Sequence, residues 1–393
     1  MIVNIEFPGS EPIENLVTCI NYKIDKVVYF GYADLIERLS KRTDAFLKKY
    51  CRVERTVFQP LSGKDLDSTL KAMDKMIRHE LSEGNKVFID ITGGEDLILV
   101  AAGILSRELD VSMHMYDIPD NRLMEYSRDT DRTLSHNAPA IKFTMDIDKY
   151  IEMMGGVINY SLHKNDKNLC VEMHIEESNA VWNIEKKYKD IWNLFTSFIA
   201  YITDGKLEYN SSIKSAETVL YHRNKTIGLN SVNRILDDLE EKELVHKVKH
   251  DSGLFGFAIK NDFVRECLIE GGAVLEEHVY IQESLTADDC RIGVHIDWDG
   301  MIHYEGQDDK IDVLNEIDVL SLRGYVPTFI SCKSGKMHDN TSLYALYELE
   351  TVARRFGGKY TKKVIASVQP VDEVCRERAK EMGIEIRPES REQ

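Results

Sequence analysis

Short apolar runs alternate with segments of helical periodicity along roughly the first 130 residues. Strands are expected at residues 1–7, 26–32, 52–58, 86–94 and 111–118. Between them, apolar residues recur every three or four positions, which predicts helices at 13–22, 33–50, 65–81 and 95–108. Strands separated by helices of this length indicate βαβ units and a parallel sheet. The run VFIDI in the fourth strand is nearly all apolar, as expected of a strand covered on both faces.

From about residue 150 to 265 helical segments dominate, among them DIWNLFTSFIAYI. The stretch from 231 to 259 then reads as an amphipathic helix, with Ile235, Leu236 and Leu239 inward, followed by a hairpin. The hairpin consists of LVHKVK, a turn at Asp251-Ser252-Gly253, and LFGFAI. A helix followed by a hairpin resembles a winged helix, which could read DNA. We favour a structural connector, because the helix exposes acids that would repel phosphate: Asp237, Asp238, Glu240, Glu241 and Glu243.

The last part of the chain, from about residue 271, returns to alternating strands and helices. Strands are expected at 292–298, 311–322, 326–333 and 362–368, and helices at 275–285, 343–356 and 372–382. The pattern therefore predicts an α/β protein in three parts: a Rossmann-like domain over 1–150, a helical connector with a winged-helix-like segment over 151–268, and a second α/β domain over 269–393.

The chain has 393 residues and a formal net charge of −17. Proteins that coat nucleic acid are usually basic, because phosphate contacts dominate affinity, so any nucleic acid is expected to be met in a local groove. The seven cysteines form no CxxC pair, which indicates reduced thiols without a zinc knuckle. No apolar run reaches the ~20 residues that span a bilayer, and the start, MIVNIEFPGSEPIENL, lacks the pattern of a secretory signal. These features predict a cytoplasmic location and no membrane partner.

Two neighbouring strands of the last part carry the most distinctive polar residues. Glu316 and Asp318 share one face of the first strand, and Ser331 and Lys333 share one face of the second. If the strands pair, carboxylates and an ammonium converge, and such a site suits a hard divalent cation such as Mg²⁺ or Mn²⁺. The ammonium could orient a water or stabilise developing charge on a phosphate. The alternative is ordinary polar residues at strand edges, but Asp and Lys are poor interior residues unless they are paired.

Four segments of the last part carry a resemblance to a known family: GGAVLEEHVY, NEIDVLSLRG, FISCKSG and LYELETVARRFGG. Together they resemble the PD-(D/E)xK nuclease domain of the CRISPR-associated Rossmann-fold (CARF) effectors of type III systems. The resemblance implies that Asp318 is a metal ligand, Lys333 the catalytic lysine, and Glu276 a helix carboxylate at the metal. Ser331 departs from the family pattern, because an acidic residue usually precedes the lysine by two positions. Either Ser331 ligates weakly through a water, or Glu316 or Glu350 replaces the acid; an ion pair with Arg354 is the ordinary alternative for Glu350.

The first part carries a second resemblance, in the segment Asp90-Ile91-Thr92-Gly93-Gly94-Glu95-Asp96. Glycines at the start of a helix let a backbone approach a ligand, and the free N–H groups there attract phosphate, although such a turn is often merely tight. In position the segment resembles the TGG-type motif of CARF domains, which contacts a cyclic oligoadenylate. Many such motifs continue with Thr-Lys, whereas two acids follow here. The expected contacts are Gly9, Ser10, Gly31, Thr92, Gly93, Gly94, Glu95 and Asp96.

The two resemblances together imply a homodimeric, metal-dependent endonuclease of antiviral CRISPR defence that a cyclic oligoadenylate activates, with cyclic tetra-adenylate the expected ring. The alternative is a non-catalytic regulator in which a CARF sensor is joined to a DNA-binding winged helix and a degenerate nuclease domain. The sequence leaves open whether the substrate is DNA or RNA, single- or double-stranded. It also leaves open the ring size of the activator and whether the sensor degrades that activator.

Overall fold

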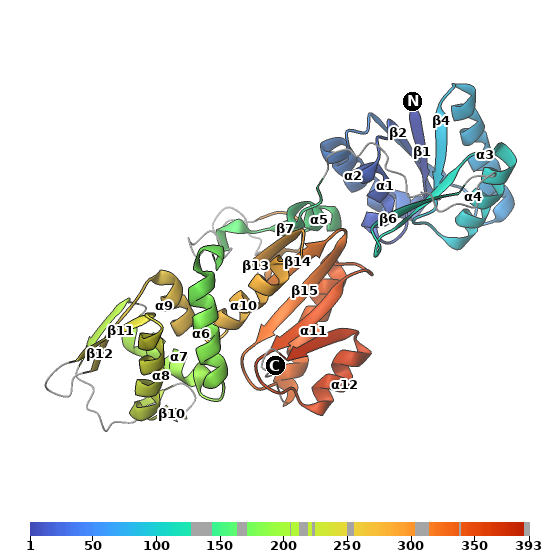
Figure 1. Ribbon diagram of the computed structural model, residues 1–393. Coiled ribbons are helices and arrows are strands. Elements are labelled where there is room, and N and C mark those ends of the chain that lie inside the picture. Colours follow the sequence, from blue (N-terminus) through green and yellow to red (C-terminus); the bar gives the residue numbers. More distant parts are fainter. Residues whose placement is uncertain are drawn as a thin grey trace. The chain divides into compact units, whose positions relative to one another are not determined.

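The computed structural model describes residues 1–126, 144–162, 171–204, 206–211, 219–221, 225–249, 255–302, 314–337 and 339–388 (Figure 1). The chain divides into two compact units. The first comprises Met1–Val157, Gly324–Val326 and Gly358–Tyr360, and the second comprises Ile158–Arg323, Pro327–Gly357 and Thr361–Gln393. The residues expected to form the connector and the C-terminal domain thus fall mainly in the same unit.

The first unit contains a six-stranded sheet in the order β3-β2-β1-β4-β5-β6. Its strands are β1 (Ile2–Glu6), β2 (Lys26–Tyr32), β3 (Arg55–Leu61), β4 (Lys86–Asp90), β5 (Met113–Asp117) and β6 (Arg122–Tyr126). All neighbours run parallel except β5 and β6, which are antiparallel. The parallel α/β sheet predicted for this part is confirmed, and β6 adds an edge strand that the hydrophobic pattern had not indicated.

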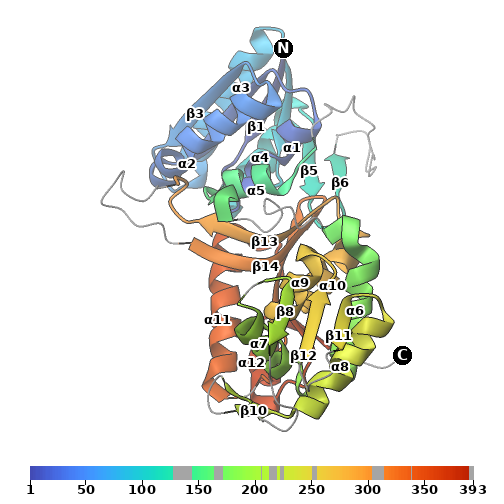
Figure 2. The same ribbon diagram turned by 90° about the vertical axis from the view of Figure 1, so that its left-hand side faces the viewer.

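Helices surround this sheet (Figure 2). They are η1 (Pro12–Asn15), α1 (Val17–Asn21), α2 (Ala33–Phe46), η2 (Leu47–Cys51), α3 (Leu66–Ser82), α4 (Asp96–Leu109) and α5 (Ile147–Met154). The apolar sides of α3 and α4 share one core with Val3, Ile5 and Phe30. The strand order reverses between β1 and β4, and in open α/β sheets ligands bind at such a point, outside the carboxyl ends of the strands.

The second unit is built on another six-stranded sheet, in the order β17-β16-β15-β14-β13-β7. Its strands are β7 (Val157–Ile158), β13 (Asp289–Asp297), β14 (Leu314–Arg323), β15 (Val326–Lys333), β16 (Lys362–Ser367) and β17 (Ile384–Pro388). Strands β13 and β14 are antiparallel, whereas β15, β16 and β17 run parallel to one another. This mixed sheet agrees with the second α/β domain that the sequence predicts.

Different helices cover the two faces of this sheet. Helix α10 (Ala273–Ser284) shares a hydrophobic core with Val319, Ile330 and Cys332. Residues 318, 331 and 333 alternate with these and therefore point to the opposite face, where α11 (Asp339–Phe356) lies. Helix α12 (Glu373–Glu381) packs beside α11.

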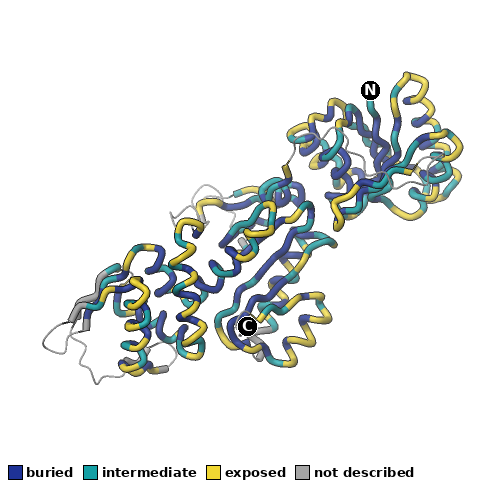
Figure 3. The backbone as a smooth tube through the Cα atoms, viewed as in Figure 1, coloured by how far each residue is buried: buried dark blue, intermediate teal, exposed yellow. Residues whose placement is uncertain are grey.

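The remainder of the second unit is mostly helical. It contains η3 (Tyr160–Leu162), η5 (Val171–His174), α6 (Ile175–Lys187), α7 (Trp192–Thr203), α8 (Leu229–Glu241), α9 (Asp262–Ile269), β8 (Glu208–Ser211), β9 (Val219–Tyr221), β10 (Lys225–Ile227), β11 (Val245–Lys249) and β12 (Phe255–Ile259). As the sequence predicts, Ile235, Leu236 and Leu239 are fully buried, and β11 pairs antiparallel with β12. Figure 3 shows buried and exposed residues alternating along the helices. The expected turn at Asp251-Ser252-Gly253 lies outside the described residues.

Several acids that the sequence places on α8 have basic partners. Lys247 pairs with Asp237, and the Lys187 ammonium lies 2.6 Å from the Asp238 carboxylate. These ion pairs link α8 to β11 and to α6.

The sequence predicts that no segment spans a membrane and that the cysteines are reduced. Among the described residues, no helix combines the length and the apolar character needed to cross a bilayer. Six cysteines of the described part carry free thiols: Cys19, Cys51, Cys267, Cys290, Cys332 and Cys375.

Candidate functional site

The strands β14 and β15 bring the distinctive polar residues of the second unit together. The two strands are neighbours in the sheet, and a two-residue turn at Gly324 and Tyr325 joins them. Gly324 has a φ of 58°, a left-handed conformation that glycine adopts without steric cost. This tight connection aligns Asp318 with Ser331, so the pairing of strands that the sequence analysis required is present.

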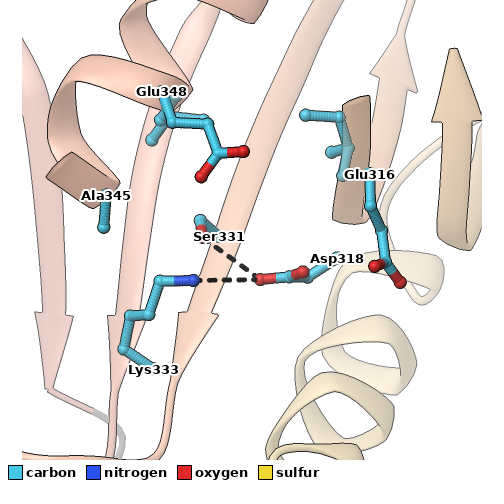
Figure 4. Close-up of a pocket in the computed structure, with 8 residues that line it drawn as sticks. Glu316, Asp318, Ser331, Lys333, Ala345 and Glu348 are labelled. Carbon is cyan, nitrogen blue, oxygen red and sulfur yellow. Dashed lines mark hydrogen bonds and ion pairs between the residues drawn. The ribbon is translucent and has the colours of Figure 1, made fainter. Parts of the chain in front are cut away.

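Asp318 is held by its neighbours through one oxygen only. The Ser331 hydroxyl donates a hydrogen bond to Asp318 Oδ2 at 3.1 Å, and the backbone N–H of Cys332 donates to the same oxygen at 2.5 Å. Lys333 Nζ lies 3.9 Å from Asp318 Oδ2 (Figure 4). Within the described part of the chain, no hydrogen bond or ion pair engages Oδ1. That oxygen is therefore available to a ligand.

The Asp318–Lys333 pair contributes little to stability. The side chains of Lys333 and Asp318 are 35% and 17% exposed, and ion pairs in contact with water are worth at most about 1 kcal/mol. Folding stability alone therefore gives little reason for this pair.

These residues line a cavity of about 190 Å³ between the sheet and α11. Its lining consists of Glu316, Ile317, Asp318, Ser331, Lys333, Ala345, Glu348 and Leu349. In Figure 4 the Glu348 carboxylate extends from α11 toward the space that Asp318 and Lys333 face. The sequence analysis missed Glu348. The spacing of Ala345, Glu348 and Leu349, which places them on one side of a helix, is the signal that could have found it.

The other carboxylates that the sequence suggested lie at the edge of this cavity or outside it. Glu316 lines the cavity with its side chain 48% exposed, and its Oε2 lies 3.8 Å from His295 Nε2. Glu350 pairs with Lys363 Nζ at 2.5 Å and does not line the cavity. Glu276 belongs to α10, which packs on the opposite face of the sheet. The structure therefore brings Glu316, Asp318, Ser331 and Lys333 together, without Glu276 and Glu350.

The oxygen atoms in the cavity suit a hard divalent cation. Among the described residues, no three His, Cys, Asp or Glu side chains form a ready-made metal cage. Mg²⁺ commonly uses one or two protein carboxylates and keeps several waters, completing its shell with substrate phosphates. A cavity that offers carboxylates and a serine hydroxyl beside a lysine suits this mode of Mg²⁺ coordination.

In the first unit, the candidate ligand residues gather at the carboxyl ends of β1 and β4. The loop after β1 and the loop after β4 are in close contact at their glycines. A Cβ added to Gly9 would lie 3.3 Å from the backbone nitrogen of Gly94, and a Cβ added to Gly93 would lie 3.3 Å from the carbonyl oxygen of Phe7. Ser10, Glu95 and Asp96 are exposed beside them. Gly31 is buried, and a Cβ there would lie 3.1 Å from the Pro8 ring.

The turn after β4 also has a structural role of its own. The Thr92 N–H donates to Asp90 Oδ1 at 2.8 Å, and Thr92 Oγ1 accepts from the Tyr116 N–H at 2.8 Å. Gly94 has a φ of 113°, and a Cβ there would lie 2.6 Å from the Cβ of Phe7. The glycines are thus needed for the packing of the turn, and they leave its exposed rim to Ser10, Glu95 and Asp96.

A buried acid pair lies beneath this turn. Burial raises the pKa of the Glu6 carboxyl well above its usual value, and the charge of Asp90 adds to that effect. Burial also opposes ionisation of Asp90, but the nearby His114 and hydrogen bonds hold the Asp90 pKa below its usual value. Glu6 is therefore the protonated partner and Asp90 the ionised one, which fixes the end of β4 where the turn begins.

Residues 264–391 match a family model described as the Card1-like endonuclease domain. A search among curated proteins finds no match. Among solved structures, protein VC1899 from Vibrio cholerae aligns with a TM-score of 0.70 at 15% identity, over 98% of this chain and 93% of that one. Can2 from Sulfobacillus thermosulfidooxidans, in complex with cyclic tetra-adenylate, aligns with a TM-score of 0.66 at 14% identity, over 99% of this chain and 94% of that one. At these identities the likeness is one of fold, and it extends over nearly the whole length of each chain.

Proposed function

We propose that this chain is a metal-dependent endonuclease whose activity is switched on by a cyclic oligoadenylate. The observation that carries the proposal is the cavity in which Asp318, Ser331 and Lys333 meet. These residues lie inside the segment that matches the Card1-like endonuclease domain. The substrate is nucleic acid, DNA or RNA, whose phosphodiester is hydrolysed in antiviral CRISPR defence.

Three residues of the cavity have assigned roles in this reaction. Asp318 would hold a divalent cation, with its Oδ2 fixed by the Cys332 N–H. When bound, Mg²⁺ or Mn²⁺ would polarise the phosphate and lower the pKa of a bound water. The Lys333 ammonium donates to a phosphate oxygen and stabilises the negative charge that develops there. Ser331 keeps the Asp318 carboxylate turned toward the cavity.

The first unit is proposed as the sensor. Its fold is shared with Can2, whose solved structure contains cyclic tetra-adenylate, and the loops after β1 and β4 adjoin at the switch point of the sheet. We expect cyclic tetra-adenylate to contact these loops, including Gly9, Ser10 and the turn from Thr92 to Asp96. A ring of this kind suits a homodimer in which equivalent loops face each other across a two-fold axis. Binding activates the nuclease only if the active arrangement has the higher affinity for the ring.

The test is a cleavage assay with purified full-length chain in Mg²⁺ or Mn²⁺. Supercoiled DNA, single-stranded DNA and single-stranded RNA are offered separately, with cyclic tri-, tetra- or hexa-adenylate or none. We expect cleavage that requires both the metal and one ring size, and that is absent in Asp318→Asn. Metal-independent cleavage, or cleavage of equal rate in Asp318→Asn, would refute the proposed site.

Ser331 is the observation that favours a second candidate, the non-catalytic regulator. In that case no variant or ligand would yield cleavage, and ligand-dependent binding to duplex DNA would appear instead. The acids of α8 and their lysine partners make the winged-helix-like segment poorly suited to bind DNA.

A further inference from the structure

The cavity lacks one carboxylate on its strands. At the position two residues before Lys333, where a metal ligand is expected, stands the neutral Ser331. Its hydroxyl is already engaged as a donor to Asp318 Oδ2. Of the residues on these two strands, Asp318 and, at the margin, Glu316 are the carboxylates that line this cavity.

Glu348 reaches the same cavity from the other side. It stands on α11, one turn after Ala345, and both side chains line the cavity with Asp318 and Lys333. Its carboxylate extends toward the space between those two residues (Figure 4). Glu348 is exposed, and within the described ranges no hydrogen bond or ion pair engages it. Nothing in the local packing thus explains an acid at this position.

The remaining acids are less suited to complete the site. Glu350, two residues further along α11, is occupied by Lys363. Glu316 lies beside His295, and in Figure 4 its carboxylate is on the side of Asp318 that faces away from Lys333. Glu276 is on a helix at the other face of the sheet.

We propose that Glu348 supplies the carboxylate that is missing at Ser331, so that Asp318 and Glu348 together hold the catalytic cation between the sheet and α11. This inference rests on the proposed nuclease function and names a ligand for its metal. Two carboxylates and retained waters suit Mg²⁺ or Mn²⁺. Since the acid comes from a helix instead of the strand, the site closes only when α11 is correctly placed against β14 and β15.

Direct measurement of metal binding tests the proposal without relying on turnover. The full-length protein is titrated with Mn²⁺ in the absence of nucleic acid, and bound metal is read by electron paramagnetic resonance. We expect Glu348→Gln to raise the Kd for Mn²⁺ by about tenfold, equivalent to ~1.4 kcal/mol. Glu377→Gln, which removes the same charge from an exposed position on α12, should leave the Kd unchanged.

A compensating variant sharpens the test. Ser331→Glu restores a carboxylate on the strand, so Glu348→Gln combined with Ser331→Glu should bind Mn²⁺ nearly as tightly as the unmodified protein. Glu350→Gln should have no effect on the Kd. Glu348 is exposed, so Glu348→Gln should retain the melting temperature of the unmodified protein.

The outcomes separate this inference from the proposed function. If Glu348→Gln binds Mn²⁺ normally while Asp318→Asn does not, Glu348 is not the ligand, yet the nuclease proposal stands. If Glu316→Gln or Glu350→Gln weakens binding and Glu348→Gln does not, the missing acid comes from that residue instead, and the inference is wrong. If Glu348→Gln weakens Mn²⁺ binding but the unmodified protein never cleaves nucleic acid, the ligand assignment holds and the nuclease proposal fails.

Discussion

The two carboxylate oxygens of Asp318 differ in what surrounds them. Oδ2 accepts hydrogen bonds from Ser331 and from the backbone of Cys332, and it faces the Lys333 ammonium. A carboxylate fixed in this way keeps its other oxygen pointing in one direction without further cost in side-chain entropy. Preorganisation of this kind is what a catalytic ligand needs and what an ordinary surface acid lacks.

At this scale, Asp318→Asn and Lys333→Ala should separate metal binding from charge stabilisation. The asparagine keeps an oxygen for the Cys332 N–H, so the fold should persist, but the loss of charge should abolish cleavage and Mn²⁺ binding. Lys333→Ala should lose at least about a hundredfold in cleavage rate and still bind Mn²⁺, because an ammonium is not a metal ligand. Cleavage rates and Mn²⁺ titrations on both variants check this, and loss of Mn²⁺ binding in Lys333→Ala would contradict it.

At the scale of elements, α6 and α10 meet through two buried acids. Glu185 on α6 is almost fully buried, and that burial, together with the charge of Glu277 on α10, raises the pKa of Glu185 to about 8. In the unfolded chain this carboxyl is expected to titrate near its usual value of 4.5. Its contribution to stability is therefore fully present below pH 4.5 and is lost as the pH rises toward 8.

Glu185→Gln should remove this pH dependence. Relative to the variant, the unmodified protein should lose stability between about pH 5 and pH 8, by up to about 1.4 kcal/mol per pH unit, and show no further difference above pH 8. Denaturant titrations at pH 5, 6, 7 and 8 measure this difference. The control is Glu176→Gln, an exposed acid on the same helix, which should give curves parallel to those of the unmodified protein.

The turn after β4 has a structural role and a proposed ligand-binding role, and two substitutions should separate them. Gly94→Ala places a Cβ 2.6 Å from the Cβ of Phe7 at a φ of 113°, so it should destabilise the first unit by about 1–3 kcal/mol. Ser10→Trp, at the exposed rim, should leave the melting temperature unchanged but raise the cyclic tetra-adenylate concentration needed for activation by about tenfold or more. Full activation of Ser10→Trp at the normal concentration would place the ligand elsewhere.

At the scale of the whole molecule, a formal net charge of −17 opposes non-specific binding of nucleic acid. In the proposed function, substrate contact is then confined to places such as the cavity beside Lys333. The acidic balance would also keep the inactive protein off cellular nucleic acid, so that control of cleavage can reside in the proposed sensor.

Ligand binding should stabilise the protein independently of catalysis. At a cyclic tetra-adenylate concentration of 100 times the Kd, the expected gain is about 2.7 kcal/mol. Asp318→Asn should show the same rise in the melting temperature of the first unit, and Ser10→Trp should show less. If Asp318→Asn abolished the ligand-induced rise, the sensor and the nuclease site would not be separate.

The sequence by itself determined much of this protein, because its strongest signals are local. Short apolar runs predict strands, and the spacing of strands and helices predicts the α/β class that the structure confirms. The two-residue period of side chains along a strand placed Glu316 with Asp318, and Ser331 with Lys333, on shared strand faces. A short turn at Gly324 then suffices to bring the two pairs together.

Only the tertiary structure decided which helices meet those strand faces. Helical periodicity shows which residues share a side of α11 or α10, but it does not show which side of the sheet each helix covers. That choice places α11 over the strand face that carries Asp318, so that Glu348 lines the cavity there. It also places Glu276 on the far face. Long-range packing decides which face of the sheet each helix covers, and a periodic pattern within one helix contains no information about that packing.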